Sequence, residues 1–155
     1  MTNIAQGLFV QGNAHDALEY IEKALTIHPK KNTEDKDYLN TVVIKGNIFS
    51  ALEKHHEAIE AYNQVLEIDK SIFQAYSNIG DSLVNLKREK EAIKYFEKSL
   101  RITTNNSTAY LNMGNAYFKL GEKEKALKYF EIADKIEPQN SNILCSKAAV
   151  YIELS

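Results

Sequence analysis

A repeat of 34 residues constrains the fold of this chain more than any other feature. Small, apolar and aromatic residues recur at this period, without a gap, in three successive segments. In register the sets are Val42, Lys45, Gly46, Phe49, Ala58, Tyr62 and Val65; Tyr76, Ile79, Gly80, Leu83, Ala92, Phe96 and Ser99; and Tyr110, Met113, Gly114, Tyr117, Ala126, Phe130 and Ala133. A period of this length indicates supersecondary units that bury their apolar faces only by stacking. The sequence therefore predicts a stack whose function depends on the surface that it creates.

The pattern inside each unit is helical. Apolar residues in the segment 122–137 recur at spacings of three and four, which is typical of one face of an amphipathic helix. Gly12 and Gly121 each lie between two such stretches and predict turns there. Pro29 and Pro138 predict the ends of two second helices. Strand signals are absent, so we expect an all-α chain of helical hairpins.

The glycines within helices predict close helix crossings. Glycine in a helix costs about 1 kcal/mol relative to alanine, so its recurrence there suggests that the partner helix passes nearby. We expect the small residues of the partner helix to lie opposite, with an aromatic residue one turn further along. The expected contacts are of Gly46, Gly80 and Gly114 with Ala58, Ala92 and Ala126, followed by Tyr62, Phe96 and Phe130.

Composition limits the classes of protein that remain. Hydrophobic residues make up 44% and charged residues 26% of the 155 residues, which is typical of a globular protein. A net charge of −2 argues against binding to nucleic acid. No apolar run is long enough to span a bilayer, and residues 1–10 do not resemble a signal peptide. We therefore expect a cytoplasmic protein with neither a nucleic-acid nor a membrane partner.

Residues for catalysis or metal binding do not form a recognisable motif. His55 and His56 are adjacent, so their side chains point in different directions on a helix and do not provide two ligands on one face. Cys145 is the single cysteine and has no histidine near it in the sequence, so we interpret it as a small apolar side chain. We expect no enzyme activity, no cofactor and no metal site.

The repeat resembles the tetratricopeptide repeat, whose pattern is an aromatic residue, Leu-Gly, Tyr, Ala, Phe, Ala and Pro. The matching residues of the segment 107–140 are Tyr110, Met113, Gly114, Tyr117, Leu120, Gly121, Ala126, Phe130, Ala133 and Pro138. The resemblance covers essentially the whole chain. It implies a single domain that forms a right-handed α-solenoid of antiparallel helix pairs, with about four and a half repeats.

The repeat boundaries follow from this register. Residues 1–31 form a divergent repeat, and residues 39–72, 73–106 and 107–140 form full repeats. Residues 32–38 are an insertion, which either extends the next helix, capped by Asn32 or Thr33 with Glu34 and Asp35 in its first turn, or forms a solvated loop. Residues 141–155 form a last helix, either as a cap or as a truncated repeat of a longer protein.

The resemblance also implies a peptide-binding groove, because the first helices of such repeats line the concave face. The implied groove residues are Asn40, Val43, Asn47, Ser50, Gln74, Ser77, Asn78, Asp81, Val84, Asn85, Thr108, Leu111, Asn112, Asn115, Phe118 and Lys119, with Asn142, Cys145 and Ala149 in the last helix. Asparagine both donates and accepts hydrogen bonds, which suits the backbone of an extended peptide. Asp81 is placed to pair with a lysine or arginine. Alternatively, the asparagines are merely typical of this family.

The implied function is a non-catalytic scaffold or adaptor for a protein or peptide partner. Some relatives in this family hold acidic chaperone tails with a clamp of lysines, asparagines and an arginine. Here only Asn47 and Asn78 match it, whereas Val43, Thr108 and Asn112 stand at the cationic positions, so we expect no binding to such tails. Two alternatives remain open. One is a substrate-recruiting region of a larger enzyme, and the other is self-association of the last helix through Ile143, Ile152 and Leu154.

Overall fold

The computed structural model describes residues 1–27 and 36–154. These residues form nine helices and no strand. The helices are α1 (Thr2–Val10), α2 (Ala14–Ile27), α3 (Lys36–Ala51), α4 (His55–Ile68), α5 (Phe73–Asn85), α6 (Glu89–Ile102), α7 (Ser107–Lys119), α8 (Lys123–Ile136) and α9 (Ser141–Leu154). The predicted all-α class is confirmed.

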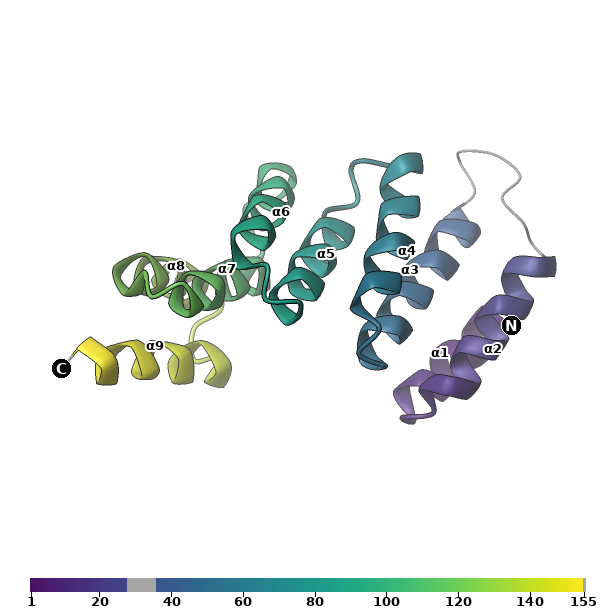
Figure 1. The fold of residues 1–155 in the computed structure, drawn as a ribbon, viewed down its shortest axis with the longest axis horizontal. Coiled ribbons are helices and arrows are strands. Elements are labelled where there is room, and N and C mark those ends of the chain that lie inside the picture. The colour runs from purple at the N-terminus through teal and green to yellow at the C-terminus, as the bar shows by residue number, and fades with distance from the viewer. Residues whose placement is uncertain (28–35, 155) are drawn as a thin grey trace.

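Each first helix packs against the second helix of its own pair, and that second helix packs against the next first helix. The pairs follow one another from the N-terminus to the C-terminus as a single elongated array (Figure 1). Successive first helices also touch one another, from α1 through α3, α5 and α7 to α9. The chain is therefore the α-solenoid that its period predicts.

The mid-helix glycines lie against aromatic rings of the second helix. A Cβ added to Gly80 would lie 2.5 Å from Cε1 of Phe96, and one added to Gly46 would lie 2.5 Å from Cε1 of Tyr62. Gly114 meets Phe130 in the same way. The crossing partner differs from the prediction, because the closest atoms belong to the ring and not to the buried alanine one turn earlier. Glycine is needed at this position because the ring occupies the space of a Cβ.

The first helices α1, α3, α5 and α7 each end in the same left-handed turn. Gly12, Glu53, Lys87 and Gly121 have φ angles of 87°, 59°, 59° and 78°. The next backbone N–H then donates to a carbonyl five residues back, as from Arg88 to Leu83 at 2.9 Å, which satisfies a free helix-end carbonyl. The turns predicted at Gly12 and Gly121 are confirmed. Glu53 and Lys87 adopt the same conformation without glycine.

Helix α3 begins before the predicted repeat boundary. It starts at Lys36 and has 16 residues, whereas α5 and α7 have 13 each. Residues 36–38 of the expected insertion are therefore helical. The expected cap at Asn32 or Thr33, the acidic Glu34 and Asp35, and the helix end at Pro29 lie outside the described residues.

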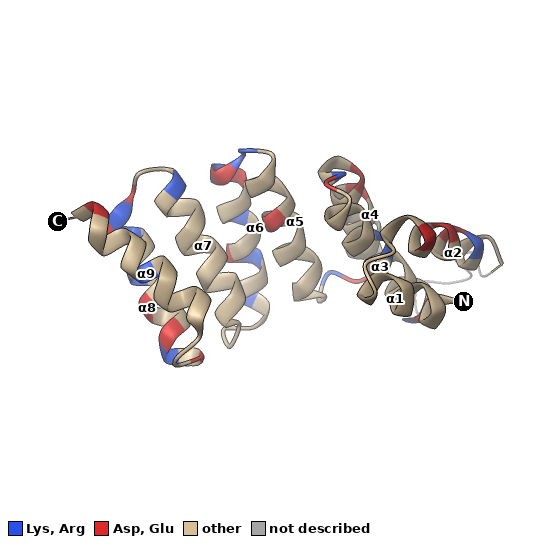
Figure 2. Cartoon of the chain, turned by 90° about the horizontal axis from the view of Figure 1, so that it is seen from below, with Lys and Arg blue, Asp and Glu red and all other residues tan. Residues whose placement is uncertain are grey.

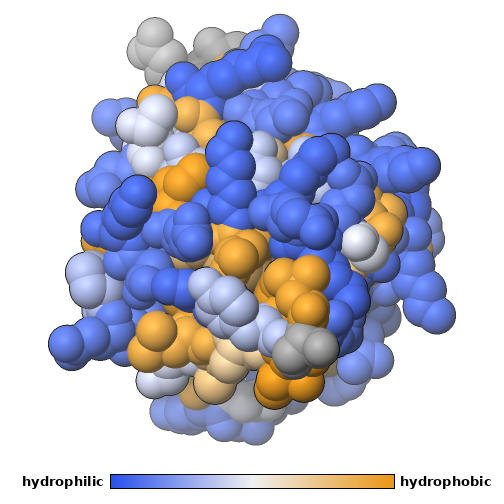
Figure 3. Space-filling view, turned by 90° about the vertical axis from the view of Figure 1, so that its left-hand side faces the viewer, coloured by the Kyte–Doolittle hydropathy of each residue, from blue (hydrophilic) through white to orange (hydrophobic). Residues whose placement is uncertain are grey.

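Helix α9 buries one face and exposes another. Ile143 and Val150 are buried, and the Lys147 ammonium pairs with the Asp134 carboxylate of α8 at 2.7 Å. The apolar side chains that stay exposed are Leu144, Tyr151, Ile152 and Leu154, and Figure 3 shows apolar side chains gathered on this end of the molecule. The expectation that Ile143 contributes to a self-association surface is wrong, because its side chain belongs to the core. No helix in the described part of the chain is both long and apolar enough to cross a membrane.

The contact between Gly80 and Phe96 predicts the effect of adding a methyl group. We expect Gly80→Ala to destabilise the fold by about 1–3 kcal/mol, because the ring of a fully buried phenylalanine must shift. The matched control is Gly7→Ala in α1, where no atom lies within 4 Å of the added Cβ. It is expected to stabilise the protein by up to about 1 kcal/mol through helix propensity. Denaturant unfolding measures both, and equal stability of Gly80→Ala and the wild type would contradict the contact.

Candidate functional site

A ladder of hydrogen bonds joins the first helices of successive repeats. The Asn78 amide donates to Oδ1 of Asn47 at 3.1 Å, and the Asn112 amide donates to Oδ1 of Asp81 at 2.5 Å. The Ser146 hydroxyl donates to Oδ1 of Asn115 at 3.4 Å. Each bond spans 31 residues, three fewer than the repeat period. The same two positions of each repeat therefore pair with those of the next, and link α3, α5, α7 and α9.

Charge is sparse along this row of helices. Helix α5 contains one charged residue, Asp81, and α7 contains one, Lys119. Charged residues are concentrated in second helices such as α6 and α8, whereas α5 and α7 are largely uncharged (Figure 2). A ligand on the first helices therefore meets few charged side chains, and each of these contributes strongly to the selection of the ligand.

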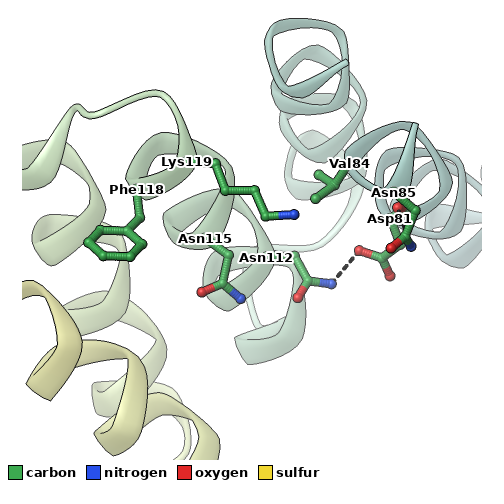
Figure 4. Close-up of a pocket in the computed structure, with 7 residues that line it drawn as sticks. All are labelled: Asp81, Val84, Asn85, Asn112, Asn115, Phe118 and Lys119. Atoms are coloured by element: carbon green, nitrogen blue, oxygen red, sulfur yellow. Dashed lines mark hydrogen bonds between the residues drawn. The ribbon is translucent and has the colours of Figure 1, made fainter. Parts of the chain in front are cut away.

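Two adjoining hollows lie on the first helices. The larger has a volume of about 360 Å³, and its lining residues are Asp81, Val84, Asn85, Asn112, Asn115, Phe118 and Lys119 (Figure 4). The smaller has a volume of about 140 Å³, and its lining residues are Asn47, Ser50, Tyr62, Asn78 and Asp81. Asp81 lines both hollows, so its carboxyl group lies where they meet.

Asp81 is an unusual carboxyl group for a surface groove. Burial raises its pKa from 3.8 to about 7, and the hydrogen bond from Asn112 opposes this rise. The Asn85 amide donates to the backbone carbonyl of Asp81 at 3.0 Å and closes one side of the site. The carboxyl group therefore gains and loses its proton near neutral pH.

Tyr62 forms the inner wall of the smaller hollow. Its ring is buried against Gly46, and its hydroxyl donates to Oδ1 of Asn47 at 2.8 Å. Burial raises the pKa of the Tyr62 hydroxyl, so this group stays protonated and acts as a donor. The repeat pattern predicts only a packing role for Tyr62. The signal for its polar role is that the other two repeats have phenylalanine at this position, Phe96 and Phe130.

The structure brings together about half of the residues expected in the groove. The larger hollow contains Asp81, Val84, Asn85, Asn112, Asn115, Phe118 and Lys119 from that expectation, and the smaller contains Asn47, Ser50 and Asn78. Asn40, Gln74 and Thr108 are exposed on the same helices but line neither hollow. Val43 and Leu111 are half-buried and pack against core clusters.

Ser77 is a correction to the expected groove. It is buried, and its hydroxyl lies 2.8 Å from that of Ser99 on α6. The Ser99 hydroxyl in turn donates to the carbonyl of Phe73. Ser77 therefore faces the second helix of its own pair, whereas Asn78, the next residue, faces α3 and belongs to the ladder.

Potential metal ligands do not converge in the described part of the chain. No three histidine, cysteine, aspartate or glutamate side chains there are grouped closely enough to hold a metal ion. Cys145 is exposed on α9.

Known proteins share this architecture. A family profile described as "Tetratricopeptide repeat" matches residues 1–71 and 71–133. No curated protein matches the chain. Similar solved structures include the crystal structure of MamA, with a TM-score of 0.80 and 20% identity over 97% of this chain and 84% of that chain. MamA 41-end from Desulfovibrio magneticus RS-1 has a TM-score of 0.81 and 21% identity over 98% and 82%.

A third similar structure contains a peptide. It is the first repeat domain of Spaghetti (RPAP3) bound to the HSP90 peptide SRMEEVD, with a TM-score of 0.73 and 23% identity over 77% of this chain and 95% of that chain. At such identities, these likenesses show a shared fold.

The raised pKa of Asp81 predicts how its removal changes stability. The folded state holds this proton more tightly than the unfolded state, so protonation stabilises the fold below pH 3.8, and this contribution is lost as the pH rises to about 7. The variant Asp81→Asn has no carboxyl group at this position, so it does not lose this stability as the pH rises. We therefore expect the free energy of unfolding of Asp81→Asn, relative to that of the wild type, to increase between pH 4 and pH 7 and then to level off.

Asp69→Asn is the matched control for this experiment. The pKa of Asp69 is lowered by hydrogen bonds from the Ser71 hydroxyl and backbone amide. The ionised Asp69 carboxylate therefore stabilises the folded state, and this stabilisation is already complete above the pKa of an aspartate in the unfolded chain. Its relative stability should stay level between pH 4 and pH 7. Chemical denaturation at pH 4.5, 6 and 8 measures both variants, and parallel profiles for Asp81→Asn and the wild type would contradict a buried Asp81 carboxyl.

Proposed function

Because the chain belongs to the tetratricopeptide repeat family, we propose that it is a non-catalytic scaffold or adaptor that binds an extended peptide or a partner helix in its groove. The tetratricopeptide fold supports protein–protein interaction in general. Binding on the first helices of this chain is the specific part of the proposal.

The observation that carries the proposal is the row of two hollows, which meet at Asp81 along α3, α5 and α7. An extended peptide has regularly spaced backbone donors and acceptors that need partners. The amide side chains of Asn47, Asn85 and Asn115 offer such partners, and Val84 and Phe118 add apolar surface for side chains of the ligand.

The partner that we propose is not an acidic chaperone tail. The RPAP3 domain in complex with SRMEEVD shows that a domain of this fold holds such a peptide. In this chain, Val43, Thr108 and Asn112 stand where the resemblance implies cations, and the larger hollow contains one cation, Lys119, beside Asp81. A ligand with several carboxylates would lack most of its charge-assisted hydrogen bonds here. We also propose a cytoplasmic protein with neither a nucleic-acid nor a membrane partner. The net charge of −2 supports the part of this proposal that concerns nucleic acid.

Two further roles are compatible with this fold. The array serves equally well as a substrate-recruiting region of a larger enzyme, which the sequence of the complete gene would reveal. Self-association is favoured by the exposure of Ile152 and Leu154, at 75% and 47%. Light scattering at increasing protein concentration tests it. A mass that rises above 17.6 kDa, and that returns to this value when Ile152 and Leu154 are both replaced by glutamate, supports self-association, and a constant mass excludes it.

Groove binding is tested with a peptide selected from an unbiased display library. Asn85 is an exposed residue of the larger hollow, so Asn85→Trp fills that hollow without disturbing the core. We expect it to weaken the selected peptide by about tenfold or more in fluorescence anisotropy. The control Asn63→Trp makes the same exchange at an exposed residue of α4 and should bind as the wild type does. Equal affinity of both variants would place the binding surface elsewhere.

A further inference from the structure

The hydrogen bonds of the ladder leave acceptor atoms exposed around Asp81. Oδ1 of Asn47 accepts from both the Tyr62 hydroxyl and the Asn78 amide. Oδ1 of Asp81 accepts from the Asn112 amide. Three oxygens then have no hydrogen bond to any described residue: Oδ1 of Asn78, Oδ2 of Asp81 and Oδ1 of Asn112.

The chemistry of the neighbouring groups determines which amide atoms remain. An ionised carboxylate only accepts, so Asn112 must turn its nitrogen toward Asp81 and its oxygen away. The protonated Tyr62 hydroxyl donates to the oxygen of Asn47, and that oxygen in turn fixes the nitrogen of Asn78. The outward-facing atoms of Asn78 and Asn112 are therefore both oxygens.

Two of these oxygens belong to side chains that neighbour Asp81. Asn78 and Asp81 are three residues apart and lie on the same face of α5, and Asn112 is held against Asp81 by its hydrogen bond. An ammonium group has three donors and a guanidinium has five, and both carry the charge opposite to that of Asp81. Asp81 thus offers a ligand cation one negative charge and one unpaired oxygen, with further acceptors on the two neighbouring asparagines.

The part of the larger hollow lined by Asn115 and Lys119 has the opposite character. Oδ1 of Asn115 already accepts from Ser146, so the amide nitrogen of Asn115 remains as a donor. Lys119 extends from α7 into the hollow toward Val84 (Figure 4) and forms no ion pair with any described residue. The groove therefore changes from acceptors at Asp81 to donors at Lys119.

We propose that the groove selects a peptide segment with a lysine or arginine side chain, which binds the Asp81 carboxylate beside Asn78 and Asn112, and with an acidic side chain that lies near Lys119. This inference rests on the proposed groove binding. Because the Asp81 side chain is half-buried, its attraction to a cation is screened by salt less than that of a fully exposed pair.

The raised pKa of Asp81 gives this interaction a signature. The cation binds the ionised carboxylate, and with a pKa of about 7 in the free protein the ionised fraction falls about tenfold from pH 8 to pH 6. Affinity should fall by the same factor in that interval. The titratable and polar groups that face Asp81 are those of Asn47 and Ser50 on α3, Tyr62 on α4, Asn78 and Asn85 on α5, and Asn112, Asn115 and Lys119 on α7. The tested peptides therefore contain no histidine.

The experiment uses histidine-free peptides selected from an unbiased library and sorted by whether Asn85→Trp blocks them. In each blocked peptide, arginine is replaced by citrulline, or lysine by glutamine, which removes the positive charge. We expect this exchange to weaken binding to the wild type by about tenfold and to leave binding to Asp81→Asn nearly unchanged. Asp69→Asn removes a carboxylate that lines neither hollow and should behave as the wild type does.

The outcomes separate this inference from the proposed function. Both the cation site and groove binding are supported if the peptides that Asn85→Trp blocks share a basic residue, lose affinity through that residue only when Asp81 is present, and bind about tenfold more weakly at pH 6 than at pH 8. Blocked peptides without a basic residue, or with equal losses on the wild type and Asp81→Asn, overturn the cation site and leave groove binding intact. An empty selection, or peptides that all ignore Asn85→Trp, overturns both.

Discussion

The contact between a mid-helix glycine and an aromatic ring is the interaction on which the rest of this structure depends. It occurs between Gly46 and Tyr62, between Gly80 and Phe96, and between Gly114 and Phe130. The absence of a Cβ lets a large ring pack directly on the backbone of the first helix, so each pair crosses in the same way. Identical pairs at a fixed period stack with a constant geometry, which aligns every other helix in one row.

That alignment places equivalent polar residues of successive repeats within hydrogen-bond distance. One interface joins two asparagines, the next joins Asp81 to Asn112, and the last joins Asn115 to Ser146. Each bond uses one side of an amide and leaves the other side open to the groove. The same side chains therefore hold the array together and provide the chemistry of the proposed binding surface. A substitution among them affects both roles, and for this reason the test of groove binding uses Asn85, which lies outside the ladder.

The fold was predictable from the sequence because its period, its glycines and its turn signals are local patterns. The site was less predictable, because it depends on which direction each side chain faces and on what lies opposite. Ser77 and Asn78 are neighbours in sequence, yet one faces α6 and the other faces the ladder. The pairing of the asparagines, the partial burial of Asp81 and the polar role of Tyr62 all arise between repeats, where the sequence of a single unit carries no information. Ile143 is a similar case: its place in an apolar stretch did not show which way it faces, and in the structure its side chain is buried.

The most direct test of partner binding along α3, α5 and α7 is to record backbone amide chemical shifts by NMR during titration with a selected peptide. If partners bind there, the largest changes occur around Asn47, Asp81 and Asn115, with little change on the charged faces of α2, α6 and α8. Changes confined to those second helices, or to the exposed face of α9, would contradict it.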